Sequence, residues 1–119
     1  MAHKTGDYFI YRLATRTEWF AAEETGVVPT RDIDRRDGYI HLSTRAQVLK
    51  TAALHFARSD DLVALEINAE TLGDELKFEL APKRGEKFPH YYGALRKDHI
   101  TRAIALTRDG AEFSFGQVI

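Results

Sequence analysis

Polar and aromatic side chains alternate with apolar ones in the segment 38–44, as they do in a half-buried strand. Such a strand presents Tyr39, His41 and Ser43 on one face. The imidazole of His41 could hold a ligand hydroxyl or phosphate, or carry a proton near neutral pH. The alternative is a buried histidine that bonds a backbone carbonyl or a neighbouring helix. The spacing alone is compatible with both roles.

A second group of aromatic and polar side chains lies at residues 88–93, where the sequence predicts a loop. Pro89 stiffens the backbone there and favours an extended conformation for the residue before it. A rigid loop that displays Phe88, His90 and Tyr91 suits stacking against a planar ring. Alternatively, Phe88 and one tyrosine close the edge of a sheet. Both groups together suggest a pocket for a small polar ligand.

Two charged residues stand in segments that otherwise read as strands. Glu79 is the only acid in the strand predicted at 76–80, where a pocket carboxylate would stabilise positive charge or bind ribose hydroxyls. Its alternative is a solvent-facing pair with Lys77 or with a cross-strand lysine. Arg12 lies mid-strand among hydrophobic residues, where an arginine usually snorkels or binds a carboxylate, and it could equally supply a fork for phosphate.

Other catalytic signatures are missing from the sequence. The glycines form no Gly-x-Gly, and neither His-Glu-x-x-His nor Gly-x-Ser-x-Gly occurs. Because the chain has no cysteine, disulfides, thiolate nucleophiles and Cys-ligated zinc are excluded. His41, His90 and Glu79 lack the close spacing of metal ligands, so no metal is expected.

Composition narrows the class of partner. The 17 basic and 18 acidic residues nearly cancel, which leaves no electrostatic footprint for nucleic acid or an anionic membrane. No apolar run approaches the ~20 residues that a membrane span needs. The first seven residues lack the apolar core of a signal peptide, so the sequence predicts a cytoplasmic protein.

The sequence predicts one domain, residues 1–119, in which helices come early and strands late. Strands are expected at 8–14, near 39–43, and at 62–67, 76–80, 100–107 and 111–115. Loops are expected at 27–37 and 82–88. In the 76–80 strand, residues 76, 78 and 80 are expected to face the core. This order indicates an α+β fold.

Capping residues mark the two predicted helices. Thr15 and Glu18 have the spacing of a capping box, and Gly26 ends that helix. Thr44 and Gln47 repeat the pattern at the second helix. If Thr44 caps that helix, Ser43 is left free to point into the pocket. An Asp-Gly pair at 109–110 predicts the turn of the last hairpin.

Several of these blocks occur in the order and spacing of a known family. They are residues 10–12, 38–44 with Gln47, 61–67, 78–79 and 88–95. The most specific are Ile-His-Leu-Ser-Thr and Phe-Pro-His-x-Tyr-Gly. From about residue 8 to residue 106, the chain resembles a family of small bacterial proteins known as domain of unknown function 952.

That resemblance implies a fold similar to the ADP-ribosyltransferases and RNA 2′-phosphotransferases, a split antiparallel β-sheet with two helices and an NAD-binding cleft. In that superfamily a first-strand Arg or His holds ribose or phosphate, a second-strand Ser, Thr or Tyr orients the nicotinamide end, and a later Glu stabilises the ribose cation. Carried over residue by residue, the candidate catalytic residues are Arg12, His41 and Glu79. The candidate substrate-binding residues are Tyr39, Ser43, Phe88, His90 and Tyr91.

The expected partner is a small molecule, a nucleotide or phosphorylated metabolite. The resemblance raises NAD as the substrate of a ribosyl-type transferase, and no resident cofactor is predicted. A departure stands at Lys77, where many of these transferases carry a Glu or Gln that activates the acceptor. A binding module without chemistry is therefore the alternative, and a third hypothesis makes the aromatic segment a subunit interface.

Overall fold

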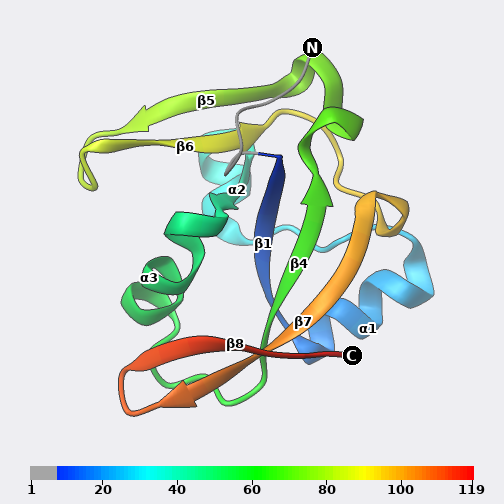
Figure 1. Cartoon of the computed structure of the whole chain (residues 1–119). Helices are drawn as coiled ribbons and strands as arrows, with labels where there is room; N and C mark the ends of the chain where they lie inside the picture. Colours follow the sequence, from blue (N-terminus) through cyan, green and yellow to red (C-terminus); the bar gives the residue numbers. More distant parts are fainter. Residues whose placement is uncertain (1–7) are drawn as a thin grey trace.

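Strands and short helices alternate along the computed structural model, which describes residues 8–119 (Figure 1). The helical elements are α1 (Arg16–Thr25), α2 (Asp32–Asp37), α3 (Arg45–His55) and the 3-10 helices η1 (Ala69–Glu75) and η2 (Lys97–His99). The strands are β1 (Phe9–Thr15), β2 (Ile40–His41), β3 (Ser43–Thr44), β4 (Leu62–Asn68), β5 (Leu76–Ala81), β6 (Glu86–Tyr91), β7 (Ile100–Asp109) and β8 (Glu112–Val118). Residues 1–7, on which the expectation about a signal peptide depends, lie outside the described residues.

The strands form two antiparallel sheets, which confirms the α+β class. One has five strands in the order β3-β1-β4-β7-β8, and the other has three in the order β2-β6-β5. The prediction of two helices was incomplete, because α2 occupies part of the predicted loop at 27–37. No helix among residues 8–119 is long and apolar enough to cross a membrane.

Two hydrophobic cores lie on opposite faces of the five-stranded sheet. The period-two alternation along β1 sends Ile10 and Ala14 into one core and Tyr11 and Leu13 into the other. The first core includes residues of α1 and of the three-stranded sheet, and the second includes the apolar residues of α3. Helices α1 and α3 accordingly lie on different sides of β1 and β4 (Figure 1). Arg12 shares the first face, which directs it toward the small sheet.

Helix ends follow the predicted capping patterns. Thr15 Oγ1 accepts from the backbone N–H of Glu18 at 3.1 Å, and the Glu18 carboxylate accepts from the N–H of Thr15 at 2.8 Å. Gly26 ends α1 in the left-handed region at φ 84°. At α3, the Gln47 side chain accepts from the N–H of Thr44 at 3.0 Å. The predicted capping boxes thus mark both helix starts correctly.

The segment around Tyr39 is not one strand, as the alternation predicted. Strand β2 pairs with β6 in the small sheet, and β3 pairs with β1 in the large sheet. Leu42 lies between the two and donates its N–H to the carbonyl of Pro89 at 3.1 Å. Because the chain leaves one sheet for the other at Leu42, residues 41 and 43 do not share a sheet face.

The predicted loop at 88–93 is also wrong, since β6 continues to Tyr91 and forms the centre of the small sheet. A proline in a central strand normally costs a ladder hydrogen bond. Here the carbonyl of Pro89 faces Leu42, beyond the end of β2, and the proline nitrogen lies on the same side of the strand. The missing N–H therefore falls where the ladder stops.

The alternation predicted for β5 holds only in part. Leu76 and Phe78 pack against the first core, whereas Leu80 is 59% exposed. The β5–β6 hairpin extends past the large sheet, so the end that carries Leu80 has no core to cover (Figure 1). The β7–β8 hairpin forms as predicted, with Gly110 at φ 64° in its turn.

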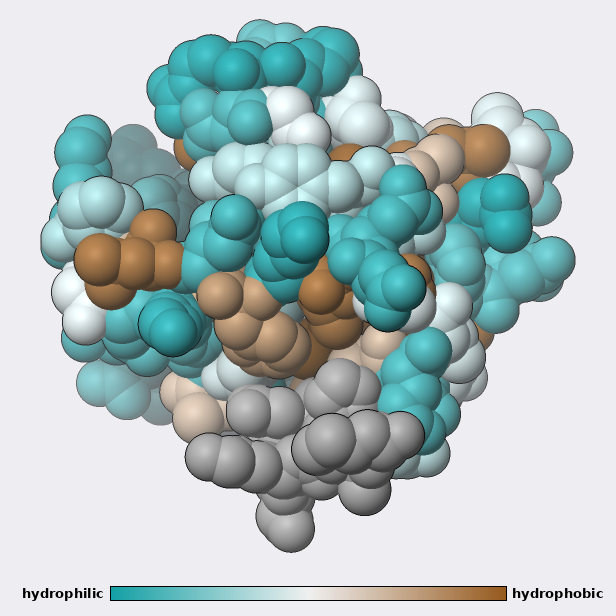
Figure 2. Space-filling model, turned by 90° about the horizontal axis from the view of Figure 1, so that it is seen from above, coloured by the Kyte–Doolittle hydropathy of each residue, from teal (hydrophilic) through white to brown (hydrophobic). Residues whose placement is uncertain are grey.

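Seen from above, the side that carries β5 and β6 is mostly hydrophilic, and its hydrophobic residues appear as separate areas (Figure 2). Scattered apolar side chains of this kind are ordinary on a folded domain. A site on this side therefore depends on specific polar contacts rather than on an apolar surface.

Candidate functional site

Four rings from the two predicted segments meet on one face of the small sheet, and we call them the ring cluster: Tyr39, His41, His90 and Tyr92. The register pairs His41 with His90 directly across β2 and β6. Tyr39 stacks on His90 with ring centroids 3.9 Å apart and an interplanar angle of 20°. The Tyr39 ring also lies 4.6 Å from that of His41 and 5.4 Å from that of Tyr92. Two segments far apart in the sequence thus contribute to one site.

Glu79 joins this cluster from β5. Its Oε1 lies 2.9 Å from Nδ1 of His90 and accepts a hydrogen bond from the Tyr92 hydroxyl at 2.6 Å. These contacts, rather than a pair with Lys77, occupy the carboxylate. His41 and Glu79 are therefore connected through the stacked rings of Tyr39 and His90, on the same side of the molecule.

The same hydrogen bonds fix the charge of this part of the cluster. Donation from Tyr92 and from His90 lowers the pKa of Glu79 below its ordinary value. In turn, the bond to Glu79 raises the pKa of Tyr92 to about 12. At neutral pH the site therefore holds an ionised carboxylate and a protonated phenol.

Arg12 lies below the cluster in a buried ion pair with Asp34. The two side chains are 4% and 1% exposed, and the guanidinium reaches both carboxylate oxygens, at 3.1 and 2.6 Å. It also donates to the carbonyls of His41 at 3.1 Å and Pro29 at 3.5 Å. With its terminal nitrogens engaged in this way, Arg12 has a structural partner where the resemblance implied a ribose or phosphate.

Asp34 is the central residue that the sequence did not identify. It is the third residue of α2, and its carboxylate accepts the backbone N–H of Arg31 at 2.7 Å, as in a capping box. Because the residue at the N-cap is an arginine rather than Ser or Thr, the pattern did not indicate a helix start. The mixed charges of 31–37 indicated a solvated loop instead.

Asp34 is ionised in spite of its burial. Desolvation favours the neutral form, but hydrogen bonds from His41 and Arg12 outweigh it and hold the pKa of Asp34 well below its ordinary value. The backbone bond from Arg31 acts in the same direction. Asp34 is therefore a fixed negative charge between β1 and β2.

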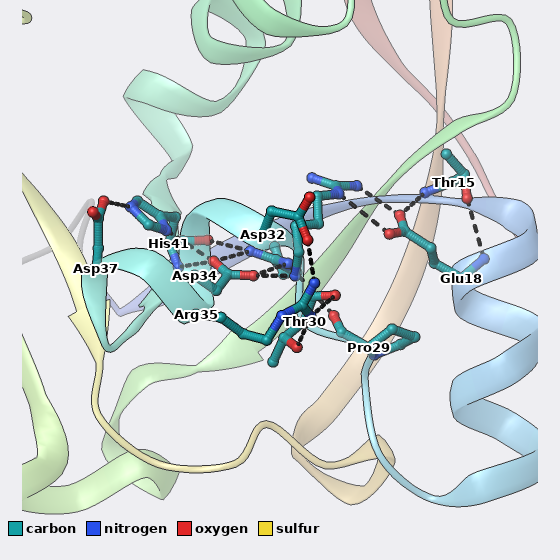
Figure 3. A network of polar contacts seen from close by, with 11 residues as sticks. Thr15, Glu18, Pro29, Thr30, Asp32, Asp34, Arg35, Asp37 and His41 are labelled. Atoms are coloured by element: carbon teal, nitrogen blue, oxygen red, sulfur yellow. Dashed lines mark hydrogen bonds and ion pairs between the residues drawn. The ribbon is translucent and has the colours of Figure 1, made fainter.

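His41 lies between two carboxylates of α2 (Figure 3). Its Nδ1 is 2.8 Å from Asp34 Oδ1 and its Nε2 is 3.0 Å from Asp37 Oδ2. The backbone N–H of His41 also donates to Asp34 Oδ1 at 3.1 Å. Both ring nitrogens are thus occupied by the protein itself.

The remaining predicted residues do not join the ring cluster. Ser43 is buried in β3, opposite Tyr11 in the large sheet, and does not join the ring cluster. Phe88 is buried in β6 opposite Glu79, with the guanidinium of Arg84 4.6 Å from its ring centroid. Tyr91 points to the opposite face of β6, where its ring is part of the first core.

A small pocket of about 210 Å³ opens beside the ring cluster. Its lining residues are Thr30, Asp34, Arg35, Gly38, Tyr39, Ile40, Tyr91, Tyr92 and Gly93. Of the predicted site residues, Tyr39 and Tyr91 line the pocket. Arg12, His41 and Glu79 do not line it, but each contacts a residue that does, either Asp34 or Tyr92. Three tyrosines thus line a pocket whose volume is smaller than the ~300 Å³ at which drug-sized pockets begin.

Gly93 helps to shape this pocket. A Cβ atom at that position would lie 2.7 Å from the Tyr91 hydroxyl oxygen and 3.0 Å from Glu75 Oε1. Glycine therefore lets the chain after β6 pass close over Tyr91. This close approach explains sterically why glycine follows Tyr92 at the end of the aromatic block.

Comparison with known proteins identifies relatives over most of the chain. A family model described as "Protein of unknown function (DUF952)" matches residues 13–103. The crystal structure of protein CC0527 from Caulobacter crescentus is 37% identical, with a TM-score of 0.82, and the match covers 89% of this chain and 93% of that one. Its solution NMR structure gives 38% identity, coverage of 89% and 90%, and a TM-score of 0.78. No curated protein matches. The chain belongs to the DUF952 family.

Proposed function

We propose that the pocket binds the planar ring of a nucleotide or of a related phosphorylated metabolite. The observation that carries this proposal is the position of Tyr39, which lines the pocket and is itself stacked on His90. A ring that is already held in place can stack on a planar ligand at little entropic cost. The expected contact is offset or edge-on, because aromatic pairs prefer these arrangements, with ring centroids about 4.5–7 Å apart. Tyr92 supplies a second ring.

The volume of the pocket supports a ligand that enters with one ring and leaves the rest at the surface. At about 210 Å³ the pocket cannot enclose a whole dinucleotide. Arg35 is the cationic residue among those that line it, and its side chain is 58% exposed. Its guanidinium pairs with Asp32 and donates to Thr30, so a phosphate would meet it at the surface as a partner shared with these residues. Arg12, in contrast, acts through Asp34 and does not touch the ligand.

Thermal unfolding with millimolar NAD, ADP-ribose or AMP tests this proposal. A ligand at ten times its Kd stabilises the folded state by about 1.4 kcal/mol, which raises Tm by several degrees. Tyr39→Leu should abolish the shift, whereas Tyr8→Leu, an exposed tyrosine outside the pocket, should retain it. Absence of a shift with all three compounds contradicts the proposal.

Glu79 favours a second candidate function, ribosyl transfer from NAD. A carboxylate kept ionised by Tyr92 and His90 is suited to stabilise the positive charge that develops on ribose as the bond to nicotinamide breaks. This is the role that the resemblance to ADP-ribosyltransferases gives it. The carboxylate is 38% exposed and hydrogen-bonds Tyr92, a residue of the pocket wall.

Release of nicotinamide from NAD separates this candidate from simple binding. If Glu79 stabilises the transition state, Glu79→Gln should keep the thermal shift and lower the release rate by on the order of 10²-fold. Glu112→Gln, at an exposed position of β8, is the matched control. Binding of NAD by the wild type without any release would select the binding module.

A further inference from the structure

His41 has both ring nitrogens directed at carboxylates of one short helix. Asp34 and Asp37 are the third and last residues of α2, and they contact Nδ1 at 2.8 Å and Nε2 at 3.0 Å. An ionised carboxylate only accepts hydrogen bonds, so each nitrogen must donate. A neutral imidazole carries one N–H, and only an imidazolium satisfies both contacts.

We propose that His41 is a positioning residue, which as an imidazolium clamps α2 onto β2 and completes the wall of the pocket only while both ring nitrogens carry protons. Its effect on a ligand rests on the proposed function. The clamp itself does not, because it is defined by contacts within the chain.

The charges around His41 come from four elements. On α2 they are Asp34, Asp37 and Arg36, the last of which bonds Asp37 at 2.9 Å. From β1, Arg12 pairs with Asp34 and donates to the His41 carbonyl. From β6, the ring of His90 lies 5.8 Å away, with Glu79 of β5 behind it. The charges of Arg12 and Arg36 already balance those of the two aspartates. The second proton on the His41 ring is therefore required by the hydrogen-bond geometry and not by the net charge.

Loss of that proton would affect the two contacts differently. Asp34 is 1% exposed and is held by Arg12 and by two backbone N–H groups, so its bond to the remaining N–H persists. Asp37 is 26% exposed and would face a nitrogen lone pair, from which it can turn to solvent. Gly38 and Tyr39 follow directly and line the pocket. Deprotonation therefore releases the C-terminal end of α2, which directly precedes Gly38 and Tyr39.

Nitrogen NMR of the imidazole tests the clamp without any ligand. In the wild type at pH 5 both nitrogens of His41 should appear protonated. As the ring loses a proton on raising the pH, the Gly38 amide and the Tyr39 ring signals should shift with the same midpoint. A His41 ring that is neutral at pH 5, or Gly38 and Tyr39 signals that ignore its titration, would overturn the proposal.

Binding of NAD measured between pH 5 and pH 9 tests the consequence. Loss of one hydrogen bond in the wall should weaken binding about fivefold across the titration. Asp37→Asn should flatten this profile, because its amide N–H can donate to the unprotonated Nε2. Asp60→Asn, an exposed aspartate paired with Arg108, should keep the wild-type profile. A wild-type profile that is already flat counts against the clamp. Failure of NAD, ADP-ribose and AMP alike to bind counts against the proposed function and leaves the NMR result to decide the clamp.

Discussion

At the scale of single residues, one buried ion pair determines where the polar groups of the site stand. Arg12 is held by Asp34, and Asp34 in turn holds His41 by both its ring and its backbone N–H. An arginine with these partners fixes the relative position of β1, α2 and β2. The residue that the family resemblance assigned to ligand binding thus has a supporting role in the structure.

Removal of one partner of this pair should be costly. Arg12→Met leaves Asp34 buried without its main cation, and breaking a buried pair in this way destabilises a protein by about 3–5 kcal/mol. Arg108→Met removes a surface pair with Asp60 and should cost at most about 1 kcal/mol. Urea unfolding of both variants measures the difference. Equal stability of the two variants would contradict the structural role of Arg12.

From the sequence, a carboxylate was one of the alternatives for Arg12, but the sequence could not indicate which carboxylate. Asp34 lies 22 residues away, and only the tertiary fold brings it to β1. The alternation of 39–43 correctly placed the side chains of Tyr39 and His41 together, and their ring centroids lie 4.6 Å apart. It failed for Ser43, since a change of sheet at Leu42 has no signature in the hydropathy pattern.

At the scale of elements, the end of β6 shapes the pocket. Tyr91 enters the core and Tyr92 turns out to Glu79, so consecutive tyrosines serve opposite faces of the small sheet. The chain can then fold back over Tyr91 only because residue 93 has no side chain. Pocket and core are therefore built by one short stretch of backbone.

Gly93→Ala should disturb both. The added methyl would stand 2.7 Å from the Tyr91 hydroxyl and 2.8 Å from its ring, and overpacking of this kind typically costs about 1–3 kcal/mol. Ala94→Ser, at an exposed neighbouring position, should have little effect. Thermal unfolding and NAD binding of the two variants measure the expected losses of stability and affinity. Wild-type stability and binding in Gly93→Ala would mean that this stretch relaxes freely.

The elements themselves were largely predictable, because β4, α1 and the β7–β8 hairpin carry strong local signals such as a continuous apolar run, a capping box and an Asp-Gly turn. Two elements were not. Helix α2 has six residues and no apolar periodicity, and β6 contains a proline that normally excludes a central strand. Both lie at the candidate site, where tertiary contacts override local preference.

At the scale of the whole molecule, ionised carboxylates tie the layers together. Besides Asp34, the central strand β4 carries the buried Glu66, which accepts from Tyr11 and Arg102. Burial of Glu66 opposes its charged form, but the bonds from Arg102 and Thr101 outweigh it and lower its pKa. Two internal sites therefore depend on carboxylates that stay ionised.

Stability should accordingly fall in acid. The pKa of Asp34 is lower in the folded than in the unfolded state, so below the ordinary aspartate range of about pH 4 the unfolded chain binds more protons. The contribution is present above that range and is lost as the pH falls through it toward the folded-state value. Denaturation by urea between pH 7 and pH 3 should show this decline, with a shallower slope in Asp34→Asn. Identical slopes would show that Asp34 does not couple folding to protons.

The change of sheet at Leu42 has one more consequence. Five residues, from Ile40 to Thr44, join the ring cluster on one side to the first turn of α3 on the other, with no slack between them. A ligand that orders Tyr39 should therefore also order the start of α3, whose residues do not line the pocket. Slower deuterium uptake in α3 would then report occupancy from a distance, through the backbone alone.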